Sequence, residues 1–240
     1  MNFLKKLPLF LSLLLLFSCD EFPLTGAENA AGLKSALEVG AKFALNTLGA
    51  QDGFLLDQAV KILLPEDAAK FIKTAESVPI IKEVIKKLET DLILAINRAA
   101  EASIEGVIPI VVNSITDMTF QDANAILFSN NNRAATDYLL QKTYQPLCNV
   151  CGDVISEALN RKIVADFSAQ SLWGQLTGYY NLVAGYIPSV KPVETNLALY
   201  TTQKALDGVF LKVGDEEVKI RTDVNARVTD LLRRVFGQLD

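Results

Sequence analysis

The sequence predicts an all-α protein, a single compact multi-helix domain of amphipathic helices behind a signal peptide and a short tether. Three observations predict this class. From about residue 31 onward, apolar residues recur at three- and four-residue steps, which is the period of one helix face. No stretch alternates strongly enough to require a sheet. Finally, a chain of 240 residues, half of them apolar, is long enough to bury one sizeable core.

The helices are expected in the following order. The segment 32–49 carries one apolar stripe and ends at Gly49, a residue typical of helix C-caps. Two short helices are expected to flank Pro65. The most regular segment follows Pro79, a residue that suits a first helical turn. Its apolar positions are Ile81, Val84, Ile85, Leu88, Leu92, Ala95, Ile96 and Ala99.

Further helices are predicted in the second half of the chain. Thr119 and Asp122 have the spacing of a capping box. The segment 133–159 should be helical but kinked or split at Pro146. Helices are also expected within 168–186 and 195–210. The last one, within 223–236, has an apolar face of Val224, Val228, Leu231, Leu232 and Val235.

Local propensity leaves two segments open between helix and strand. The segment 106–115, "GVIPIVVNSI", is rich in β-branched residues. The segment 209–221, "VFLKVGDEEVKIR", has the pattern of a hairpin when it is considered alone.

The N-terminus has the organisation of an export signal. Residues 1–6 are basic and residues 7–17 are apolar, a run too short to span a bilayer well. The residues before Cys19 are Leu16, Phe17 and Ser18, a pattern that resembles the lipobox of bacterial lipoproteins. This resemblance implies cleavage after Ser18, a diacylglyceryl thioether on Cys19, and a further acyl chain such as palmitate on the new amino group. A structural cysteine after an ordinary signal peptide, or a membrane anchor, is the alternative.

The chain therefore divides into a lipoprotein signal peptide (1–18), a lipidated cysteine with a flexible tether (19–30) and a helical domain (31–240). Two or three acyl chains hold a protein stably on a membrane. A tether of some ten residues reaches only about 15–20 Å, so the domain should lie close to the bilayer. The expected location is the bacterial cell envelope, facing the periplasm or the cell surface. Inner and outer membrane are both left open.

Composition excludes several classes of function. The net charge is −5, and removal of residues 1–18, which carry two lysines, leaves −7. This acidity argues against nucleic acid as a partner and gives no overall attraction to anionic lipid. Histidine is absent, so a Ser-His-Asp triad and an HExxH zinc helix cannot form within this chain. The expected partners are the membrane, through the lipid anchor, and an envelope protein. No metal or other cofactor is expected.

Several motifs together resemble one known family. In order, "GLKSALEVGAKFALNTLG", "GFLLDQAVKILLP", "INRAAEA", "DMTFQDANAIL", "ATDYL", "TTQKALDGVF" and "IRTDVNARVTDLLRRVFG" are similar to the bacterial domain-of-unknown-function family 4197 over residues 32–237. The resemblance implies an exported, mainly helical domain, and it favours helix over hairpin after Phe210. It implies no reaction.

Polar residues within these motifs form three candidate clusters. We hypothesise that they converge into one network between helices or a small cleft, although ion pairs and caps that fix helix docking would explain the same residues. Asp215, Glu216 and Glu217 are interpreted as a solvated turn or helix face. The clusters are Asn97, Arg98 and Glu101; Gln203, Lys204 and Asp207; and Arg221, Asp223 and Arg227, with Asp230 after them.

Cys148 and Cys151 form a CxxC motif. Its spacing places both sulfurs on one side of a helical turn. A zinc site would need two further ligands, and a thioredoxin-like dithiol would need a βαβ setting that the sequence does not predict. A disulfide or two inert thiols is the preferred interpretation, since disulfides form outside the cytoplasm.

Three functions remain. The first is a non-catalytic envelope lipoprotein that binds a protein or supports envelope structure. The second is a binder of lipid or another apolar ligand between its helices. The third is an enzyme, either a CxxC oxidoreductase or a carboxylate-based hydrolase.

Overall fold

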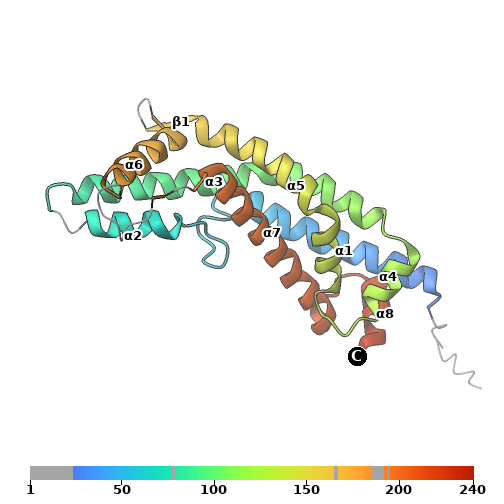
Figure 1. Cartoon of the computed structure of the whole chain (residues 1–240). Coiled ribbons are helices and arrows are strands. Elements are labelled where there is room, and N and C mark those ends of the chain that lie inside the picture. The colour runs from blue at the N-terminus through green and yellow to red at the C-terminus, as the bar shows by residue number, and fades with distance from the viewer. Residues whose placement is uncertain (1–23, 77–78, 165–166, 185–191, 194) are drawn as a thin grey trace, which may run out of the picture.

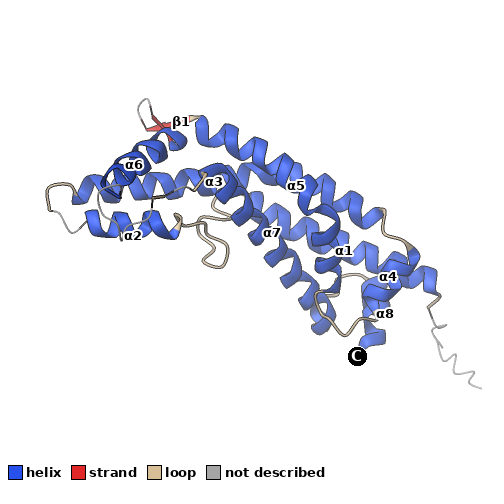
Figure 2. Cartoon of the chain, in the orientation of Figure 1, coloured by secondary structure: helices blue, strands red, loops and turns tan. Residues whose placement is uncertain are grey.

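The computed structural model describes residues 24–76, 79–164, 167–184, 192–193 and 195–240. These residues form one all-helical domain with eight α-helices, and the only strands among them are the short antiparallel pair β1 (Lys162–Val164) and β2 (Phe167–Ser168) (Figure 2). The helices are α1 (Gly26–Gly49), α2 (Glu66–Ala75), α3 (Lys82–Thr116), α4 (Phe120–Leu127), α5 (Ala134–Asn160), α6 (Ala169–Ala184), α7 (Leu197–Thr222) and α8 (Asp230–Phe236), with 3-10 turns η1 (Val224–Ala226) and η2 (Gly237–Leu239).

Four long helices, α1, α3, α5 and α7, build the centre of the molecule. The 35-residue α3 packs most extensively against α5 and α1, and α7 packs against α5 and α1. Figure 1 shows an elongated body: the start of α1, α4, α8 and the C-terminus lie at one end, whereas the start of α3 lies at the other. Every described core residue falls between Ala30 and Phe236, so the segment 24–240 holds this whole core.

Side-chain caps fix several helix starts. The capping box at α4 is confirmed, because the Thr119 hydroxyl accepts from the Asp122 amide while the Asp122 carboxylate accepts from the Thr119 amide. A second capping box joins Thr25 and Glu28, so α1 begins at Gly26. Residues 26–30, which the sequence analysis assigns to the tether, therefore belong to α1.

Both segments with strand propensity are helical. Residues 106–115 lie inside α3 and residues 209–221 lie inside α7, as the family resemblance implies for the latter. Pro146 neither ends nor splits α5, which runs unbroken from Ala134 to Asn160. Tertiary packing on the buried face of each helix overrides the local preference.

Two predicted helices differ from the structure. The short helix expected directly before Pro65 is absent, because residues 50–65 form turns and irregular backbone; of the two expected helices only α2, after Pro65, is present. The last predicted helix is divided into η1 and α8. Thr229 caps α8, and Val224 and Val228 are exposed instead of facing the core. Because Thr229 caps the helix, α8 begins only at Asp230, and Val224 and Val228 lie before it.

In the described part of the chain, no helix combines the length and apolar character that a membrane-spanning segment requires.

Candidate functional site

Asn97 of α3 holds the segment that links α1 to α2, residues 50–65, which we call the 50–65 loop. Its side-chain amide accepts a hydrogen bond from the Ile62 amide at 2.9 Å and donates one to the Ile62 carbonyl at 2.8 Å. It also donates to the Ile93 carbonyl one turn earlier. Asn97 and Ile62 are both buried, so the side chain replaces the partner that a neighbouring strand would offer.

Arg98 and Glu101 hold the start of the same loop. The Arg98 guanidinium bridges Glu101 (2.6 Å) and Asp52 (2.7 Å), while the other oxygen of Glu101 accepts from the Phe54 amide at 3.2 Å. The hydrogen bond between Arg98 and Glu101, with a further one to Asp52, raises the pKa of Arg98 above its ordinary value. Asp52 has a positive φ of 70°, so this ion pair stabilises a strained backbone.

A glycine completes that turn. Gly53 follows Asp52, and a Cβ at this position would lie 2.3 Å from the Thr47 carbonyl oxygen. Any side chain there would collide with backbone, which only glycine avoids.

The helix α7 holds the loop from its other side. Tyr200 donates its hydroxyl to the Leu63 carbonyl at 3.0 Å, and the Lys212 ammonium pairs with Asp57. This contact with Lys212 lowers the pKa of the Asp57 carboxyl. Gly208 lets the loop approach closely, since a Cβ there would lie 2.8 Å from the Phe54 ring.

Gln203, Lys204 and Asp207 lie on the exposed side of α7. Lys204 pairs with Asp207 at 3.1 Å, and both line a shallow pocket of about 300 Å³ together with loop residues 59–63. Gln203 is exposed. This cluster thus borders the loop that the first cluster holds.

Arg221 belongs to a buried network where α7 meets the end of α4 and the start of α5. It donates to Glu217 at 3.0 Å and to the carbonyls of Ile126 and Leu127, which end α4. Glu217 in turn accepts from the amides of Ala135 and Thr136, at the start of α5. One ion pair therefore joins three helices. The interpretation of Glu217 as solvated is wrong, because only 3% of its side chain is exposed.

Arg227 and Asp223 organise the segment between α7 and α8. Arg227 donates to the carbonyls of Ile220 and Arg221 and forms a bidentate pair with Asp240, both contacts at 2.7 Å. Asp223 caps η1 by accepting from the Asn225 amide at 2.9 Å. The Asp230 carboxylate pairs with Arg233 on the surface.

The structure therefore places the nine residues in three separate groups. Two groups meet at the 50–65 loop, and the third closes the ends of α4, α5 and α7. Glu217 was missed although its spacing of four residues from Arg221 signals an ion pair. Asp57 lies within the motif "GFLLDQAVKILLP", whereas Asp52 and Lys212 lie in none of the family motifs; only the fold brings these side chains to their partners.

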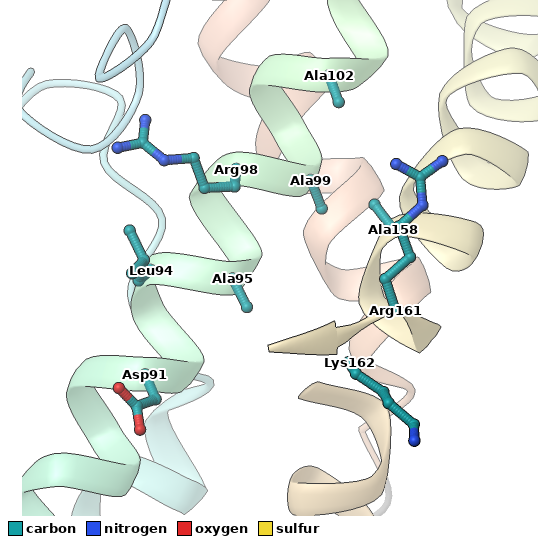
Figure 3. Close-up of a pocket in the computed structure, with 9 residues that line it drawn as sticks. All are labelled: Asp91, Leu94, Ala95, Arg98, Ala99, Ala102, Ala158, Arg161 and Lys162. Carbon is teal, nitrogen blue, oxygen red and sulfur yellow. The ribbon is translucent and has the colours of Figure 1, made fainter. Parts of the chain in front are cut away.

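A pocket of about 400 Å³ lies on the other side of α3, facing the end of α5. In Figure 3, Ala95, Ala99 and Ala102 project from α3 toward Ala158 of α5, while Arg98 projects away toward the 50–65 loop. Arg161 and Lys162 stand at its edge, and Arg161 pairs with Glu157. Four small side chains make the floor of this pocket apolar and leave its volume open.

Cys148 and Cys151 lie in the middle of α5 with both thiols free. Cys151 is fully buried, and burial raises its pKa to about 11. A reactive thiol needs the opposite shift. Within the described ranges, no group of three or more His, Cys, Asp or Glu residues is arranged to hold a metal ion. Cys19 lies outside the described residues.

The fold and these contacts define an all-helical domain whose buried polar side chains bind its own backbone. Within that class, the chain belongs to the family DUF4197, described as proteins of unknown function, whose model matches residues 23–237. No curated protein and no solved structure matches the chain.

Proposed function

We propose that this protein is a non-catalytic envelope lipoprotein: a helical binding or structural module held at a membrane surface by lipidated Cys19. The lipobox pattern that ends at Cys19 supports the anchor. The capping box at Thr25 leaves only a few residues between Cys19 and α1, so the domain stays close to the bilayer.

One observation carries the non-catalytic part of the proposal. In the described residues, every buried side-chain nitrogen and oxygen has a hydrogen-bond partner. For Asn97, Glu101 and Glu217 the partners include backbone amides of the loop or of a helix start. Groups engaged in this way fix the fold, whereas a catalytic group must face a substrate.

Mass spectrometry of the N-terminal peptide tests the anchor. In the full chain made in a bacterium, this peptide should begin at Cys19 and carry acyl chains, and the protein should sediment with membranes. The Cys19→Ser variant should lose both properties. An unmodified Cys19, or a chain that retains residues 1–18, would contradict the proposal.

Cross-linking of the anchored protein in intact cells tests the binding part. The expected result is one recurrent envelope protein cross-linked to the domain. The Lys204→Glu variant, altered at the exposed pocket beside the 50–65 loop, serves as a probe of that surface, and Lys42→Glu on α1 serves as its control.

A small apolar ligand is the second candidate function, and the alanine-floored pocket favours it. Ala102 lies at its exposed side, so Ala102→Trp should fill the pocket without disturbing the core. If the pocket holds such a ligand, an apolar fluorescent probe should bind the parent chain and not this variant. Equal binding to both would remove this candidate.

A further inference from the structure

The turn that leads into α3 exposes a group of large apolar side chains. Ile80 is 92% exposed and Val84, in the first turn of the helix, is 68% exposed; Ile81 between them is also exposed. Single apolar residues are common on protein surfaces, but adjoining ones mark interaction sites.

Lysines surround this apolar group. Residues 79–88 contain Lys82, Lys86 and Lys87 against one acid, Glu83. Lys87 pairs with Asp91 of the same helix, whereas Lys82 and Lys86 form no ion pair within the described part of the chain. Glu89 and Asp91 follow directly, so the positive charges beside the apolar group that lack an ion-pair partner among the described residues are Lys82 and Lys86.

Its position separates this segment from the N-terminal end. Residues 79–87, which we call the tip, lie at the opposite end of the elongated body from the start of α1 (Figure 1). The 35 residues of α3 span about 52 Å at 1.5 Å per residue.

We propose that the tip docks on a bilayer surface that contains anionic phospholipid. Ile80, Ile81 and Val84 enter the interface between headgroups and acyl chains, as apolar faces of interfacial helices do. The Lys82 and Lys86 ammonium groups reach the lipid phosphates beside the inserted apolar side chains. The acidity of the whole chain does not oppose this contact strongly, because charges farther away than a Debye length are screened.

Vesicle sedimentation tests the proposal with the chain 24–240, which lacks Cys19 and therefore separates the tip from any lipid anchor. This chain should sediment with vesicles that contain phosphatidylglycerol and far less with phosphatidylcholine alone, and salt should weaken the binding. The double variant Ile80→Ser, Val84→Ser should bind at least about tenfold more weakly. Lys82→Gln and Lys86→Gln should each weaken binding about fivefold.

A matched control comes from α1, where Val39 and Phe43 are also exposed and lie four residues apart. Serine at both of these positions should leave vesicle binding unchanged, and circular dichroism should show that all variants remain folded. The proposal is overturned if the parent chain does not bind anionic vesicles, binds both vesicle types equally, or binds equally well after the change at Ile80 and Val84.

Discussion

Two regions of this molecule use charged side chains to hold backbone, and they differ in solvent exposure. At the 50–65 loop, Arg98 bridges two acids while 35% of its side chain stays exposed. At the junction of α4, α5 and α7, Arg221 and Glu217 are only 2% and 3% exposed. Water can solvate the Arg98 guanidinium and so weakens its two ion pairs, whereas it does not reach the pair of Arg221 and Glu217. The comparison indicates that the buried ion pair at the junction contributes more to global stability than the partly solvated ion pairs of Arg98 at the loop.

Glu217→Ala should have the largest effect. It leaves Arg221 buried without its partner and removes the acceptor of the Ala135 and Thr136 amides. The expected loss is about 3–5 kcal/mol of unfolding free energy, measured by urea denaturation. Glu216→Ala, which breaks a half-buried pair with the exposed Lys219, is the control and should cost at most about 1 kcal/mol. Equal losses would show that burial does not separate the two regions.

Asn97→Ala should come next. The substitution leaves the buried amide and carbonyl of Ile62 without partners, which should lower the free energy of unfolding by about 2–3 kcal/mol. The 50–65 loop contains Lys61, so trypsin should cut there faster in the variant than in the parent chain. Asn160→Ala, which removes one exposed hydrogen bond at the end of α5, should leave the cleavage rate at Lys61 unchanged.

Arg98→Ala should have a smaller effect on global stability, about 1 kcal/mol, because the side chain is partly solvated. Asp207→Ala removes only the ion pair with Lys204, in which the aspartate is 64% exposed. Its free energy of unfolding should stay within about 0.5 kcal/mol of the parent value. Thermal melting compares the two variants. If Arg98→Ala melted at the same temperature as the parent, Arg98 would not stabilise the fold, and the result would favour a binding role for it.

The contact between Lys212 and Asp57 should make stability depend on pH. The Lys212 contact lowers the pKa of Asp57 in the folded state, so its contribution is fully present above the unfolded value of about 3.9 and is lost as pH falls through the folded value. Asp57→Asn should remove up to about 1 kcal/mol at neutral pH and flatten the loss of stability below about pH 4. Urea midpoints at several pH values measure this; a parallel pH profile for both chains would contradict it.

Much of the fold follows from local signals. The apolar period predicts α3, and Thr119 with Asp122 predicts the start of α4. The 50–65 loop shows the limit of such signals. Its apolar residues are buried although they lie in a loop and not on a helix face; they are Phe54, Val60, Ile62 and Leu64. What orders them is Asn97, which lies far along the chain, and no local pattern encodes that contact.

The candidate site divides in the same way. Motifs selected Asn97, Arg98, Glu101 and Arg221, and the structure gives each of them buried or half-buried partners. Their separation into distant groups was not predictable, since it depends on how α3 and α7 cross. The role of Glu217 was masked by its acidic neighbours Asp215 and Glu216, which do lie nearer the surface.

The length of α3 has a consequence for orientation. A body tethered at one end only is free to swing about its attachment point. With the anchor proposed at Cys19 and a second contact at the tip, about 52 Å of helix would separate the two attachments and remove most of that freedom. The long axis of the domain would then lie along the bilayer, so a neighbouring protein would meet the flank of the body and not its end.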